Sequence, residues 1–448
     1  MKVDLLNGKL NKTYFTLLTS AIASTIVSTI YSTVDIICVG HYAGPEGAAA
    51  IVCINPLWAL IFAFGFLCGV GGAVMMANRR GANDNHAANE YYTIATVMSL
   101  IFSTLLVAVY SLFTEPILVM LGAEGEVLRL GVQYMQGMIF SIPTFTVCAC
   151  LSTFMRSDGE ALIPTIATIT GGIINMLLDV LLVFVFDMGV KGAGLATGIG
   201  QTVAFSIILF YFFTKKCTLK FTKPHKTAPV VIKIVTVGFA AFIIDLTSGV
   251  TTAVHNMIIT NNLTASHLAV YSTASMMIIM FNSLFSGIGT AMQPMVAIGF
   301  GAGDTKRVKG VVRLSFLTAI AMGFLFLSLC ELFPGTLLRV YMDVTDEVMD
   351  VGPRIIRLYT LALPITGICL VCNYYFQATL HRGASVLISL LRGLIFPILL
   401  VLTIPLLMGY DYIWLGVPFG EILTCIIAIL IILPMLKSLT NKKAAQLK

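Results

Sequence analysis

The sequence predicts an all-α polytopic membrane protein with twelve transmembrane helices in two pseudo-symmetric six-helix bundles. An apolar composition, a series of long apolar runs and an internal repeat support this prediction. Hydrophobic residues make up 58% of the 448 residues and charged residues only 11%, whereas soluble domains carry about 25% charged residues. Apolar runs of about 20 residues are long enough to cross a bilayer as helices. The twelve predicted spans are 14–39, 48–77, 92–113, 131–155, 162–186, 192–213, 233–259, 267–299, 314–334, 355–380, 385–408 and 412–436.

The two halves of the chain share landmarks at a spacing of 220 residues. Gly81–Asp84 (GAND) aligns with Gly301–Asp304 (GAGD), and Gly200 aligns with Gly420. Each landmark takes the same place in its own series of spans, and the Asp that ends each four-residue loop is expected to cap the next helix or tie a tight turn. Internal repeats are a common plan of secondary transporters, and an even number of spans in each half predicts parallel repeats.

The distribution of Lys and Arg predicts the orientation in the membrane. Of the 27 basic residues, 22 fall on the side of the N-terminus and five on the other, so both termini are expected to be cytoplasmic. The domains expected are an N-terminal bundle at 1–215, a basic cytoplasmic linker at 216–232 and a C-terminal bundle at 233–448. The net charge of +6 reflects this orientation and does not imply nucleic acid. We expect a monomer in the plasma (inner) membrane.

The sequence offers no chemistry typical of an enzyme. Nine of the ten cysteines fall in predicted spans, where they are typical small apolar helix residues. No zinc-like spacing, nucleotide-binding loop or nucleophile–base constellation is present. We therefore expect no catalytic activity, no cofactor and no metal other than a coupling ion.

Four polar residues of the N-terminal half are predicted to lie at one depth in the membrane. Asp35 lies near the outer end of the first span, and Thr197 lies near the outer end of the sixth. Asn175 and Asp179 lie one helical turn apart on one face of the fifth. No Lys or Arg lies inside a span of this half, so each buried carboxylate must take a proton or bind a cation. Oxygen ligands suit a hard ion such as Na⁺, and a structural hydrogen bond between a neutral acid and an amide is the alternative.

The C-terminal half carries a second, weaker set of polar residues inside its spans. Arg392 is expected to neutralise Asp245 or Glu421, as either a structural ion pair or a relay. His255 takes the register position of Asp35, and is either a hydrogen-bonded core residue or part of the coupling.

Three further residues are candidates for a substrate cleft. Tyr31 lies one turn before Asp35 and either stacks on a cation or simply packs. Met280 and Met292 belong to a methionine-rich eighth span, which suits loosely specified apolar ligands or plain core packing.

Four segments together resemble the signature of the multidrug and toxic compound extrusion (MATE) family. They are VDIICVGHYAG at 34–44, NMLLDV at 175–180, KGAGLATGIGQ at 191–201 and MQPMVAIGFGAGD at 292–304. The likeness covers nearly the whole chain, and the last segment is most similar to the bacterial and archaeal branch that includes the DNA-damage-inducible relatives. One departure is the stretch LLTSAIASTI at 17–26, which lacks the proline that relatives often carry midway along the first helix.

The resemblance implies secondary active export of small cationic or amphipathic compounds by H⁺ or Na⁺ antiport, with alternating access. In that branch the ion site uses an Asp of the first helix, an Asn and an Asp of the fifth and a Thr of the sixth, which match Asp35, Asn175, Asp179 and Thr197. Two alternatives stay open. One is a flippase of a lipid-linked precursor, which the near absence of basic residues inside the spans disfavours. The other is an exporter of a specific native metabolite.

Overall fold

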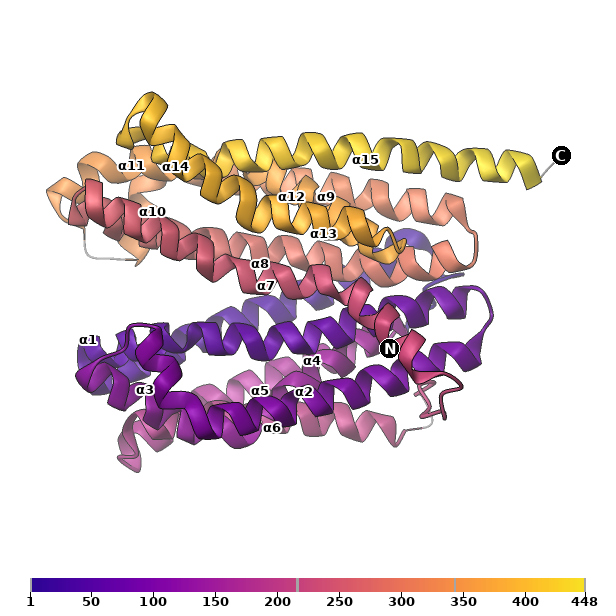
Figure 1. Ribbon diagram of the computed structural model, residues 1–448, viewed down its shortest axis with the longest axis horizontal. Helices are drawn as coiled ribbons and strands as arrows, with labels where there is room; N and C mark the ends of the chain where they lie inside the picture. The colour runs from indigo at the N-terminus through magenta and orange to yellow at the C-terminus, as the bar shows by residue number, and fades with distance from the viewer. Residues whose placement is uncertain (1, 215–216, 342–343, 447–448) are drawn as a thin grey trace. The chain divides into compact units, whose positions relative to one another are not determined.

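The computed structural model describes residues 2–214, 217–341 and 344–446, and all regular elements in these ranges are helical (Figure 1). The side chains of residues 245, 248, 249, 253, 265 and 438–446 lie outside the description. The elements are α1 (Leu10–Gly81), α2 (Asn85–Met120), α3 (Gly125–Met138), η1 (Ile139–Ser141), α4 (Ile142–Ser157), α5 (Leu162–Val180), η2 (Leu181–Val185), α6 (Gly189–Phe212), α7 (Thr227–Asn262), α8 (Ala265–Gly301), α9 (Thr305–Leu332), α10 (Pro334–Tyr341), α11 (Asp346–Thr360), α12 (Leu363–Ala378), α13 (Arg382–Leu390), η3 (Leu391–Ile395), α14 (Phe396–Met408), η4 (Tyr410–Leu415) and α15 (Gly416–Gln446).

The number of membrane crossings agrees with the sequence. Within the described residues, eleven helical segments are long and apolar enough to span a bilayer. The longest, α1, has 72 residues and contains one residue with non-helical dihedral angles, Gly44 at φ 66° and ψ −158°. A positive φ favours glycine, and the chain changes direction there, so α1 supplies two crossings. The predicted twelve transmembrane helices are confirmed.

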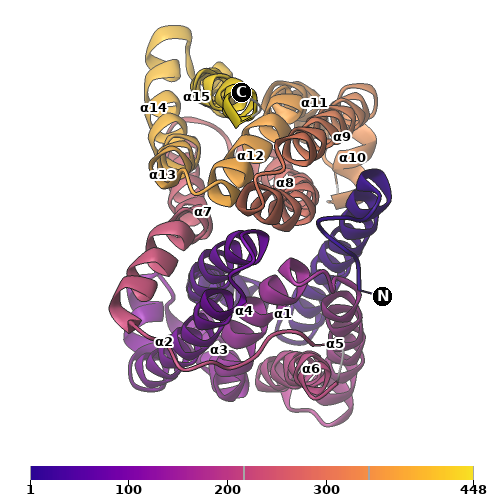
Figure 2. The same cartoon turned by 90° about the vertical axis from the view of Figure 1, so that its right-hand side faces the viewer.

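The chain packs as two units, Met1–Asp245 and Leu246–Lys448. In the N-terminal unit, α5 packs along α6, α1 packs against α2 and α4, and α3 packs against α6; Figure 2 shows these helices nearly end-on. In the C-terminal unit, α12 packs against α8 and α9. The boundary falls inside α7, whose first half therefore belongs by its contacts to the N-terminal unit.

The internal repeat is visible in the turns that follow the second and eighth spans. Asn83 has φ 61°, and Gly303, which lies 220 residues further on, has φ 71°. In each turn the next residue caps the following helix: Asp84 Oδ1 accepts a hydrogen bond from Ala87 N at 3.1 Å, and Asp304 Oδ1 accepts one from Arg307 N at 3.0 Å. The predicted capping role of both Asp residues is confirmed.

The first span is an unbroken helix through the stretch that lacks proline. There the Ser20 hydroxyl donates to the Ala161 carbonyl at 2.9 Å, and the Ser24 hydroxyl donates to Thr165 Oγ1 at 3.0 Å. These hydroxyl groups tie α1 to the start of α5, so the position often taken by a proline in relatives serves here as a contact between helices.

Two spans contain a single π-helical turn. η2 continues α5 directly after the segment that carries Asp179, and η3 joins α13 to α14 and contains Arg392. A π turn places one additional residue in the helix and frequently occurs near functional residues. Both predicted polar regions are thus next to a local irregularity of the helix that carries them.

Candidate ion site in the N-terminal unit

Close contacts at glycines bring α3, α5 and α6 together around the predicted site. A Cβ atom added to Gly194 of α6 would lie 2.2 Å from the carbonyl oxygen of Tyr134 in α3. A Cβ added to Gly171 of α5 would lie 2.7 Å from the carbonyl oxygen of Gly200 in α6. Small residues allow such close approach of transmembrane helices, and here they set the distance between the polar side chains carried by the three helices.

Asp35 and Thr197 are joined through a tyrosine. Tyr134 Oη donates a hydrogen bond of 2.7 Å to Asp35 Oδ2 and lies 3.2 Å from Thr197 Oγ1. The Thr197 hydroxyl also donates to the carbonyl of Ala193 at 3.0 Å, one turn earlier in α6. Tyr134 is only 1% exposed, so this link between α1, α3 and α6 lies inside the unit.

Asn175 links the same threonine to Asp179. Its Nδ2 group donates to Thr197 Oγ1 at 3.2 Å and to Asp179 Oδ1 at 3.4 Å. Asn175 is 3% exposed and Asp179 is fully buried. The structure thus brings the four predicted residues into one connected set of hydrogen bonds with Tyr134 as a fifth member.

Sequence reasoning missed Tyr134, although a signal for it was present. The fourth predicted span starts at residue 131 on the outer side, so Tyr134 falls near the same depth as Asp35 and Thr197. The position of this hydroxyl group within the fourth span was therefore a usable signal for Tyr134.

Three oxygen atoms of the site have no hydrogen-bond partner among the residues that the structure describes. They are Asp35 Oδ1, Asn175 Oδ1 and Asp179 Oδ2. Neither carboxylate has an ion-pair partner within the same described ranges. A buried acceptor left without a donor is costly, and these atoms therefore favour a proton or a small cation that binds to them.

The polar residues of the C-terminal unit are paired differently. Arg392 Nε donates to Glu421 Oε1 at 2.7 Å, and Arg392 Nη2 donates to Asn282 Oδ1 at 3.1 Å. The side chains of Arg392 and Glu421 are 14% and 9% exposed. Arg392 thus pairs with one of the two acids considered for it; the other, Asp245, has a side chain outside the described residues.

His255 is buried against an aromatic ring. Its Nδ1 atom lies 2.9 Å from the carbonyl oxygen of Thr251, one turn earlier, and its ring stacks on Tyr271 with centroids 5.4 Å apart. His255 Nε2 has no partner among the described atoms. These contacts favour the reading of His255 as a hydrogen-bonded core residue.

The three candidates for a substrate cleft occupy different surroundings. The Tyr31 ring packs against Gly172 of α5, where an added Cβ would lie 2.9 Å from the ring. Met292 is fully buried, as expected for core packing. Met280 is partly exposed and its sulfur lies 3.9 Å from the Tyr341 hydroxyl. Tyr31 and Met280 are thus both partly exposed, whereas Met292 is not.

Twelve apolar spans around a buried polar site define a multi-pass membrane protein. The MatE family model matches residues 20–181 and 246–403, and the chain belongs to this family of transporters. It is not an enzyme, because members of the family are transporters.

Relatives and solved structures agree with this assignment. The chain is 25% identical over 427 residues to the multidrug export protein MepA of Staphylococcus saprophyticus, covering 95% of this chain and 94% of the relative. It is 27% identical over 427 residues to MepA of Staphylococcus haemolyticus, with coverage of 94% and 93%. Its fold is similar to an outward-facing multidrug resistance MATE family transporter of the MOP superfamily, with TM-score 0.91 at 19% identity and coverage of 98% and 99%. A MOP superfamily transporter from Pyrococcus furiosus, described as having a binding pocket of reverse polarity, gives TM-score 0.90 at 19% identity and coverage of 98% and 100%.

Proposed function

We propose that the protein exports small cationic or amphipathic compounds by antiport with H⁺ or Na⁺. The observation that carries this proposal is the set of three unpartnered oxygen atoms on Asp35, Asn175 and Asp179. A proton would bind to Asp35 Oδ1 or Asp179 Oδ2. A sodium ion would instead be held by these oxygens together with a hydroxyl of Thr197 or Tyr134, since a hard cation prefers oxygen ligands.

Charge connects the ion to the substrate. When the two carboxylates are ionised, they attract a cation, since no ion-pair partner neutralises them among the described residues. When a proton or Na⁺ is bound, that attraction is weaker. An ion and a cationic substrate therefore disfavour each other's binding, and this coupling is reciprocal. Alternating access between the two sides of the membrane converts the coupling into exchange.

The relatives support a broad substrate range and the Lys and Arg distribution supports the orientation. Two relatives that match nearly the whole chain are named multidrug export proteins. The excess of basic residues on the side of the N-terminus favours cytoplasmic termini in the plasma (inner) membrane. We propose that a single chain is the transporting unit, with the N-terminal bundle at 1–215 as the part that binds the ion.

The test is efflux of a cationic dye from proteoliposomes under an imposed proton gradient and, separately, a Na⁺ gradient. Wild type should move dye with one of the two gradients, and that gradient names the coupling ion. Asp179→Asn should abolish the movement, while Asp187→Asn, which changes an exposed carboxylate, should keep it.

Two outcomes would count against the proposal. If the Asp179→Asn variant still shows gradient-driven dye efflux, the proposed ion site is not needed for transport. No movement by correctly folded wild type would favour a narrow native metabolite, or flipping of a lipid-linked precursor, over multidrug export.

A further inference from the structure

Two histidines and a glutamate meet at the end of the N-terminal unit where the chain passes from α6 to α7. His86 and Glu90 lie four residues apart near the start of α2, so they share one face of that helix. His225 lies in the connection just before α7. The ligand atoms of the three side chains all lie within 4.8 Å of one another.

We propose that His86, Glu90 and His225 form a binding site for a divalent transition-metal ion such as Zn²⁺, and that the ion fixes the α6–α7 connection to α2. Two imidazoles and one carboxylate are ligands that zinc prefers, and three protein ligands leave a fourth position for water. No residue of this set belongs to the proposed ion site, and all three lie within the N-terminal unit.

The distances suit a tetrahedral ion. Ligands at about 2.0–2.2 Å from zinc lie roughly 3.4 Å from each other. His86 Nδ1 is already 3.4 Å from Glu90 Oε1. His225 Nδ1 is 2.7 Å from the same oxygen, so it must withdraw by less than about 1 Å to admit the ion. Its side chain is 76% exposed and is free to do so.

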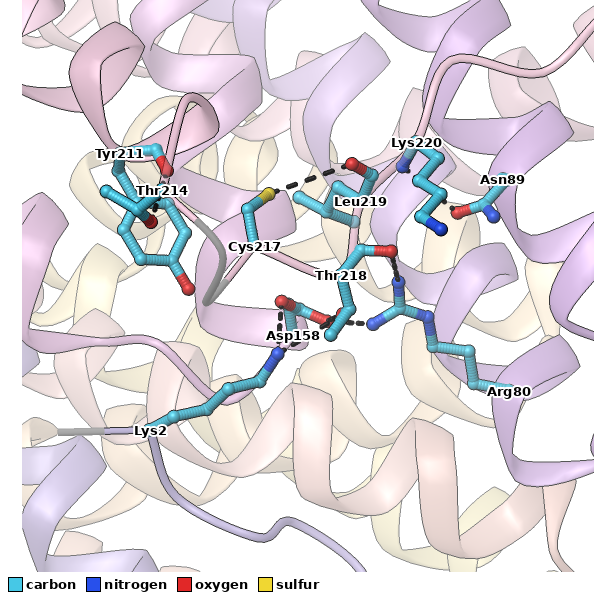
Figure 3. A network of polar contacts seen from close by, with 10 residues as sticks. All are labelled: Lys2, Arg80, Asn89, Asp158, Tyr211, Thr214, Cys217, Thr218, Leu219 and Lys220. Carbon is cyan, nitrogen blue, oxygen red and sulfur yellow. Dashed lines mark hydrogen bonds and ion pairs between the residues drawn. The ribbon is translucent and has the colours of Figure 1, made fainter.

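Other contacts hold the connection close to α2, so the third ligand is largely in place. The backbone N–H of Thr222 donates to Thr93 Oγ1 at 2.9 Å, and that of His225 donates to Glu90 Oε1 at 3.1 Å. Figure 3 shows the preceding part of the connection, where Lys220 N donates to Asn89 Oδ1 at 3.4 Å. Because the backbone is already ordered, metal binding costs little additional conformational entropy.

The first experiment is calorimetric titration of ZnCl₂ into the purified full-length protein, with no histidine in its affinity tag. Wild type should bind one ion per chain. His86→Ala and His225→Ala should each raise the Kd at least about tenfold, whereas His41→Ala, which removes an exposed histidine outside the cluster, should leave it unchanged. Absence of binding in wild type, or wild-type affinity in both cluster variants, would overturn the site.

The second experiment tests the effect on the connection. Trypsin cuts after the exposed Lys220 and Lys226, and ZnCl₂ should slow this cleavage at least severalfold in wild type but not in His86→Ala. Equal cleavage of the two proteins without zinc shows that the variant is folded. Zinc binding with unchanged cleavage of wild type would overturn the claim that the ion fixes the connection.

Discussion

The Tyr134 hydroxyl donates a 2.7 Å hydrogen bond to Asp35 Oδ2, while Asp35 Oδ1 has no partner among the described atoms. One side of the carboxylate is therefore held in position, and the other side is available to a proton or cation. Because the same hydroxyl lies 3.2 Å from Thr197 Oγ1, we expect a change at Asp35 to affect the site residues of α5 and α6.

Removing the Tyr134 hydroxyl should weaken transport without changing the packing. Tyr134→Phe keeps the ring but deprives Asp35 of its donor, and a hydrogen bond to a charged group contributes about 1.5–3 kcal/mol. We expect the initial rate of ion-driven dye efflux to fall roughly 10-fold or more. Tyr110→Phe is the matched control, because buried Tyr110 donates to the backbone carbonyl of Leu57, outside the site. Equal rates in the two variants would contradict a role for the Tyr134–Asp35 hydrogen bond.

The close contact between α3 and α6 should be necessary for the site. In Gly194→Ala the new methyl group meets the Tyr134 backbone, which must move and take its side chain away from Thr197. We expect loss of transport and a lower melting temperature, with a cost of about 1–3 kcal/mol for overpacking. Gly383→Ala is the control, since nothing lies within 4 Å of an added Cβ there. A Gly194→Ala protein with wild-type transport would show that the contact is dispensable.

The Arg392–Glu421 pair should behave as a structural ion pair. Removing one partner leaves an uncompensated buried charge and costs about 3–5 kcal/mol, whereas replacing both with apolar residues is often nearly neutral. Arg392→Met and Glu421→Leu should each lower the melting temperature, and the double variant should recover most of the loss. If the recovered double variant folds but no longer transports, the pair acts as a relay instead.

Asp158 should control access to the α6–α7 connection. Its buried carboxylate accepts from Lys2 at 2.7 Å and also binds Arg80 and Thr218 (Figure 3). Asp158→Asn removes the charge that balances two cations, so the connection should open more often. We expect Cys217 to react with a maleimide severalfold faster in this variant than in wild type or Asp187→Asn, measured by mass spectrometry of the labelled peptide.

The pH dependence of that labelling follows from the environment of Cys217. Burial raises the pKa of the Cys217 thiol above its usual value, so less thiolate is present at neutral pH than for an exposed cysteine. Labelling of wild type should therefore be slow at pH 7 and should keep increasing as the pH rises beyond the ordinary thiol pKa. If the labelling rate instead levels off at a pH near the ordinary thiol pKa, the thiol is already exposed to water.

The sequence predicts the helices, and the position of a residue within its span predicts its depth in the membrane. Asp35, Asn175, Asp179 and Thr197 share a predicted depth, which follows from their positions within their spans. Their role as an ion site stays a prediction. Tyr134 could be placed at the right depth but not beside Asp35 and Thr197, because these contacts depend on how α3 packs against α1 and α6.

The C-terminal unit and the connection show what cannot be read from spacing. The sequence left two possible partners for Arg392, Asp245 and Glu421. Its hydrogen bond to Glu421 follows from the packing of η3 beside α15. His86, Glu90 and His225 come together although they lie up to 139 positions apart. Their spacing in the sequence matches no metal-binding motif, so the cluster could not be predicted from it.

The two π turns change how one half of the chain should be compared with the other. Each turn adds one residue to its helix, one in the first repeat and one in the second. The two additions cancel beyond both turns, so the spacing of 220 residues is kept there and Gly200 still aligns with Gly420. The turns do not occupy equivalent places, however: η2 follows Asp179, whereas η3 precedes Leu399, the residue in its register position.

Between these places the two helices are out of phase by one residue, or about 100° around the helix axis. The residue that shares the direction of Asp179 in the second repeat is then Leu400 and not Leu399. Both are leucines, so the second repeat has no carboxylate in this direction by either alignment. The second repeat thus carries a leucine where the first carries Asp179, and its own buried carboxylate, Glu421, is paired with Arg392. If the proposed ion site is correct, the stoichiometry of coupling is expected to be set by the N-terminal half of the chain.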